Sequence, residues 1–128
     1  MFRRVVDYYV PASQKGSVEQ SIRDSWHLFI QFANDKPLIY SFINSQIIKG
    51  QLPESIDSAF QALVDDLAEL NKTKALTLSP FKAAQLLWAG ANGAATAVAA
   101  AKARPEVTVD VSEQMLAALL KFMLAANE

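Results

Sequence analysis

The single histidine is the first residue to consider for chemistry, because no other imidazole is present to act as a base. Asp24 precedes His27 by three residues, so a helix would bring the carboxylate and the imidazole to one face. Such a pair can act as a base, yet the sequence fixes no nucleophile beside it. We therefore expect His27 to be a surface imidazole and the chain not to be an enzyme. A small enzyme that uses His27 with Asp24 is kept as an alternative.

Cofactor sites are not expected either. Asp65, Asp66 and Glu69 form an acidic cluster, but carboxylates on a helix fan outward, whereas a metal ion needs converging oxygens. The four glycines lack the spacing of a phosphate-binding loop. No cysteine is present, which excludes disulfides and thiolate ligands and fits a reducing, cytoplasmic environment. The sequence predicts no metal and no cofactor.

The charge distribution gives little support for a nucleic-acid or membrane partner. The formal net charge is −1, and no recognition helix with its preceding turn is found, so we expect no direct nucleic-acid contact. Residues 83–101 carry no charge and are nearly long enough to span a bilayer. They are mostly alanine, however, and the amides of Gln85 and Asn92 would be costly in lipid. We expect a buried helix here and no membrane.

Bulky apolar side chains occur in four of the expected helices, and bundling would bring them together around a cavity. The polar residues Gln85, Asn92 and Thr96 follow at helical spacing and could orient a ligand there. The predicted ligand-binding residues are Trp26, Phe29, Ile30, Tyr40, Phe42, Phe60, Trp88 and Asn92. In the alternative, the aromatic residues fill a packed core, and Gln85 and Asn92 face solvent or a partner subunit.

Proline, glycine and serine positions divide the chain into helices. Ser17 with Gln20 forms a capping box, Gly50 is expected as a C-terminal cap, and Ser79 and Ser112 are expected as N-terminal caps. The six expected helices cover residues 1–10, 17–33, 37–50, 53–70, 80–104 and 112–125. Residues 71–74 form a polar break, and residues 106–111 a linker of alternating valines. The sequence therefore predicts one all-α domain over residues 1–128, a six-helix bundle.

The expected helices differ in their apolar faces. The fourth is amphipathic, with a stripe of Ile56, Ala59, Phe60, Leu63, Leu67 and Leu70. The second buries Val18, Ile22, Trp26, Phe29, Ile30 and Ala33, and its opposite side carries Gln20, Arg23, His27, Gln31 and Asn34. The sixth is apolar on too many sides for a helix that touches only its own core.

Small residues on the fifth helix suggest that another helix approaches it closely. In a monomer, the fifth and sixth helices would leave a large apolar patch in water. Pairing with their copies in a four-helix arrangement of a two-fold dimer would cover this patch. The predicted interface residues are Leu86, Gly90, Gly93, Ala97, Leu116, Leu120 and Met123. The alternative is a monomer in which both helices are central.

Three stretches of the chain match a known pattern in type and order. Residues 2–9 read FRRVVDYY, residues 26–33 read WHLFIQFA before KPLIY at 36–40, and residues 83–93 read AAQLLWAGANG. In these stretches the chain resembles the C-terminal ligand-binding and dimerisation domain of TetR-family transcriptional regulators. The resemblance covers nearly the whole chain, and residues 1–12 would be the stub of the helix that connects to a DNA-binding domain.

This resemblance implies an effector-sensing homodimer whose helical cavity binds a small apolar or aromatic molecule. It implies a role in transcription regulation, with DNA binding only in the intact repressor. The helix-turn-helix domain is missing before Phe2, so the expectation is a fragment or a version without a DNA reader. Asn92 also departs from the histidine more often expected before the glycine. A helical dimeric interaction protein with a filled core and no ligand is the alternative function.

Overall fold

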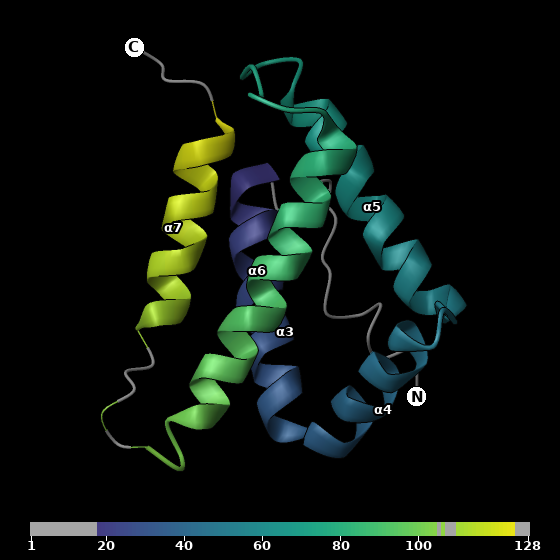
Figure 1. The fold of residues 1–128 in the computed structure, drawn as a ribbon. Helices are drawn as coiled ribbons and strands as arrows, with labels where there is room; N and C mark the ends of the chain where they lie inside the picture. Colours follow the sequence, from purple (N-terminus) through teal and green to yellow (C-terminus); the bar gives the residue numbers. More distant parts are fainter. Residues whose placement is uncertain (1–17, 105, 107–109, 125–128) are drawn as a thin grey trace. The chain divides into compact units, whose positions relative to one another are not determined.

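All regular elements of the computed structural model are helical within the residues that it describes, namely 18–104, 106 and 110–124. The only strand-like feature in these ranges is an isolated antiparallel bridge between Leu76 and Leu124. The five helices, shown in Figure 1, are α3 (Val18–Asp35), α4 (Pro37–Ile48), α5 (Glu54–Leu70), α6 (Pro80–Ala100) and α7 (Val111–Met123). The all-α prediction is confirmed. The expected helix over residues 1–10 and the Ser17 cap lie outside the described residues.

The C-terminal end of α4 follows from one glycine. Gly50 adopts a φ of +85°, a left-handed conformation that glycine reaches without the clash of a Cβ atom. Its backbone N–H donates to the carbonyl of Ile47 at 2.9 Å, and the Gln51 N–H donates to Gln46 at 2.9 Å. These two bonds form a Schellman motif and satisfy carbonyls that the helix end leaves without partners. The predicted cap at Gly50 is confirmed.

The helix starts show one correct prediction and one error. Ser79 caps α6, because its Oγ accepts a hydrogen bond from the Lys82 backbone N–H at 3.2 Å. The N-cap of α7 is Asp110, and Ser112 lies inside the helix with 7% of its surface exposed. The prediction of Ser112 as a cap was therefore wrong. Serine commonly caps helices, but here the helix begins before it.

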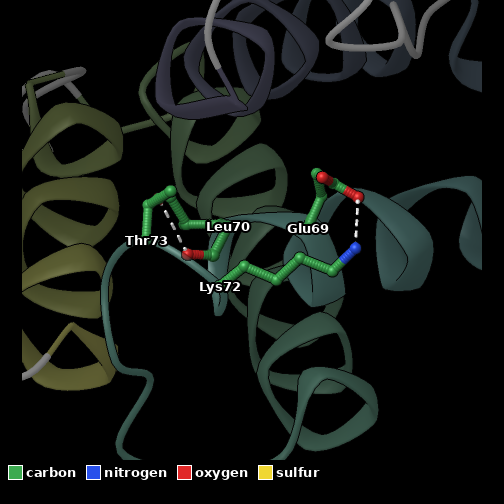
Figure 2. Close-up of polar contacts among 4 residues, drawn as sticks. All are labelled: Glu69, Leu70, Lys72 and Thr73. Atoms are coloured by element: carbon green, nitrogen blue, oxygen red, sulfur yellow. Dashed lines mark hydrogen bonds and ion pairs between the residues drawn. The ribbon is translucent and has the colours of Figure 1, made fainter.

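The end of α5 is shaped by local polar contacts, which Figure 2 shows. The Thr73 hydroxyl donates to the Leu70 carbonyl at 3.2 Å, and Lys72 pairs with Glu69 at 3.4 Å. The ion pair is solvent-exposed and adds little stability. Asn71 contributes more to the shape of the loop, because its Oδ1 accepts from the Leu76 backbone N–H at 2.9 Å. The predicted polar break after Leu70 is thus a hydrogen-bonded turn.

The chain divides into two compact units, Met1–Leu63 and Val64–Glu128. The division falls within α5, where the sequence predicts no boundary. In the first unit α3 packs on α4. In the second, α6 and α7 lie side by side and run in opposite directions, drawn in green and yellow in Figure 1.

The core of the first unit agrees in part with the predicted helix faces. Trp26 is 4% exposed on α3, and Asp57, which lies away from the predicted apolar stripe of α5, is exposed. The other buried apolar side chains of this unit are Ile22, Phe32, Ala33, Ile43 and Ile56. Phe32 and the buried Ser21 were not predicted. Asn34, assigned to the polar side of its helix, is half-buried, and its Oδ1 is shielded from solvent.

The second unit combines a face of alanines with a face of large side chains. The buried residues of α6 are Ala83, Ala84, Leu87, Ala91, Ala94 and Ala95. The buried apolar residues of α7 are Leu116, Leu120 and Met123. Small side chains on one helix allow the other to approach closely, so this composition suits a tight antiparallel pair. Despite its low charge, α6 does not form a membrane span, since no described helix is long and apolar enough to cross a bilayer.

Candidate functional site

An aromatic contact joins the two helices of the first unit. The rings of Phe29 on α3 and Tyr40 on α4 have centroids 5.7 Å apart and an interplanar angle of 77°. This edge-to-face arrangement is favourable because the positive edge of one ring meets the negative face of the other. Both residues were predicted to bind a ligand, and the structure brings them together.

The phenol of Tyr40 has a pKa displaced from its ordinary value. Burial raises the pKa of its phenol above the ordinary value of 10.0, while a hydrogen bond with the Asn44 side chain opposes the rise. The phenol is therefore neutral near pH 7. It presents a polar group at the edge of an aromatic contact, the combination that orients ligands in apolar sites.

The remaining predicted ligand residues of the first unit differ in exposure. Trp26 is buried, whereas Ile30 and Phe60 are half-buried. Phe42 is 46% exposed, and it lies four residues after Leu38, which is 85% exposed. Residues at this spacing share one helix face, so Phe42 lies on an exposed apolar face of α4 instead of with the buried aromatic residues.

Two polar atoms of the first unit are buried without a hydrogen-bond partner in the described structure. They are Oδ1 of Asn34 on α3 and Oγ of Ser55 in the first turn of α5. Sequence reasoning missed both of them. Asn34 lies three residues after Gln31 and seven after His27, both exposed, so helical spacing gave no signal that its oxygen would be shielded.

Trp88 and Asn92, the other two predicted ligand residues, belong to α6 in the second unit and are half-buried. The Asn92 side chain donates from Nδ2 to the Trp88 carbonyl at 3.0 Å. Thr96, one turn later, donates from its hydroxyl to the Asn92 carbonyl at 3.1 Å. Both polar side chains thus bind the backbone of their own helix.

The predicted dimer residues fall into two groups. On α6, Gly93 is exposed, while the others predicted there are half-buried, namely Leu86, Gly90 and Ala97. On α7 the predicted residues are buried within the single chain, with exposures of 0%, 5% and 0% for Leu116, Leu120 and Met123. The apolar residues of α7 that a second copy would reach are instead Met115 and Phe122, which are 39% and 61% exposed.

The C-terminal end of α7 is held by the loop between α5 and α6. The Thr77 backbone N–H donates to the Met123 carbonyl at 2.8 Å, and its hydroxyl donates to the Phe122 carbonyl at 2.9 Å. These bonds satisfy two of the carbonyls that a helix end leaves free. They fix the backbone from which the exposed Phe122 side chain projects.

The residues considered for catalysis and metal binding show no converging geometry. His27 is exposed on α3, and the Asp24 carboxylate accepts a hydrogen bond from Gln20 Nε2 at 2.8 Å. Within the described residues, no group of three or more histidine, cysteine or acidic side chains could hold a metal ion. The aromatic group of α3 and α4 and the exposed surface of α6 and α7 are therefore the two candidate sites.

Comparison with known proteins finds no matching family model, no matching curated protein and no matching solved structure. The evidence for function therefore comes from these two sites and from the order of the helices.

Proposed function

We propose that this chain is an effector-binding and dimerisation module of the TetR type, which acts in transcription regulation. The first unit would bind a small apolar or aromatic molecule, and α6 and α7 would pair with a second copy. The observation that carries the proposal is an exposed glycine in the middle of α6.

Within the described residues, no contact explains why position 93 is a glycine. It is exposed, and a Cβ atom built on it would meet nothing within 4 Å. A glycine in a helix interior costs roughly 0.5–1 kcal/mol relative to alanine. A close approach by a helix from outside the chain would account for that cost, because only a residue without a side chain lets two helix backbones come near.

The exposed side of α7 supports the same proposal. Phe122 is 61% exposed and Met115 is 39% exposed, and seven residues separate them, so they lie on one helix face. A helix that buries Leu116 and Leu120 on one side and exposes large apolar residues on another has a second face to cover. A two-fold dimer would cover this face with the same residues of the second copy.

The ligand-binding half of the proposal is supported by the aromatic group of the first unit. Phe29 and Tyr40 form an edge-to-face pair, and Tyr40 carries a neutral, partly buried phenol. Apolar walls with a few placed polar groups are typical of small-molecule sites.

One observation favours the alternative of an interaction protein without a ligand. The α4 face that carries Leu38 and Phe42 is apolar and exposed, and Ile48 at the end of the helix is 85% exposed. Exposed apolar patches commonly mark protein interaction sites. A chain that dimerises and binds no small aromatic molecule would fit this alternative.

A single introduced thiol tests the proposed interface. Because the chain contains no cysteine, Gly93→Cys would carry its only thiol. Two copies of a residue near a two-fold axis face each other, and a disulfide forms where their Cβ atoms lie about 3.5–4.5 Å apart. We expect mild oxidation to convert Gly93→Cys rapidly to a covalent dimer.

The matched control is Gln51→Cys, an exposed position in the loop after α4. Oxidation of this variant at the same protein concentration reports the rate of chance collisions. If Gly93→Cys cross-links no faster than Gln51→Cys, then Gly93 does not lie at a two-fold contact, and the main support for the proposed interface is lost.

A further inference from the structure

We draw no further inference here: the strongest candidate, the apolar face of α4 that exposes Leu38 and Phe42, carries nothing because no observation within the described residues shows what covers it.

Discussion

The helix pair α3–α4 and the helix pair α6–α7 differ in the side chains that they bury. The helices α6 and α7 pack together, with mainly alanines buried on α6 and large side chains such as Leu116 buried on α7, and the Thr77 hydroxyl binds the C-terminal end of α7. The α3–α4 pair has an aromatic contact, and α4 buries a single residue, Ile43. Both of the unpartnered buried atoms found in the described structure lie in the first unit.

This difference suggests that the two helix pairs have different roles. A seam of small against large side chains leaves little room, so it suits a rigid element that presents a fixed surface. A pair joined by an aromatic contact, in which α4 buries a single residue, has more to gain from an added apolar molecule. The variants below test this comparison, first in the second unit and then in the first.

The largest effect is expected from Leu116→Ala. Leu116 is fully buried, so its truncation removes apolar contacts and leaves a cavity, at a cost of about 2–5 kcal/mol. The matched variant Gln114→Ala, at an exposed residue of the same helix, should cost much less. Urea unfolding measured at a fixed protein concentration compares the two. Similar costs for both variants would show that the seam does not hold the second unit together.

A smaller effect is expected from Thr77→Val, which removes the hydroxyl bond to the Phe122 carbonyl. The expected loss of unfolding free energy is about 1 kcal/mol, the usual contribution of one hydrogen bond. Thr96→Val is the control, because the Thr96 hydroxyl donates to the Asn92 carbonyl in the preceding turn of its own helix. Equal stability losses in the two variants would mean that the hydrogen bond from Thr77 does not stabilise the C-terminal end of α7.

The smallest effect concerns Tyr40 and alkaline pH. Burial raises the pKa of Tyr40, so the folded state holds this proton more tightly than the unfolded state does. The resulting stabilisation is complete below the ordinary pKa of 10.0 and is lost as the pH rises through the folded value.

The pH dependence of stability can be compared between wild type and Tyr40→Phe. We expect the urea midpoint of the wild type to fall more steeply above pH 10 than that of the variant, because phenylalanine has no proton to lose. If the urea midpoints of the two proteins fall in parallel with pH, the phenol is not buried, and the evidence for an aromatic site in the first unit is weaker.

Much of the helix layout was predictable because its signals are local. Pro37, Gly50 and Ser79 each act within one helical turn, and the structure confirms the boundaries that they predict. Ser112 misled because a serine also fits inside a helix when its side chain is buried. The hydrogen bond between Thr77 and Phe122 joins residues 45 positions apart, so no local pattern could have predicted it.

The candidate sites were less predictable because a helical face is known only approximately from spacing. Phe29 and Tyr40 meet as expected, yet Phe42, two residues after Tyr40, lies on the exposed face of α4. Asn34 was assigned to the polar side from its position on the helix, and spacing does not show which atoms of a side chain are shielded from solvent. On α7, spacing identified an apolar helix but could not tell which apolar residues face the chain's own interior and which face outward.

The most direct test of the account is the mass of the chain in solution, measured by light scattering for the wild type and for Gly93→Leu. The account predicts a wild type of twice the single-chain mass. It predicts a helical monomer for Gly93→Leu, because the chain itself leaves open space at this position and only a second copy would meet the new side chain. Ser58→Leu, at an exposed position of α5, should remain dimeric. A monomeric wild type, or a Gly93→Leu variant that dimerises as the wild type does, would contradict the account.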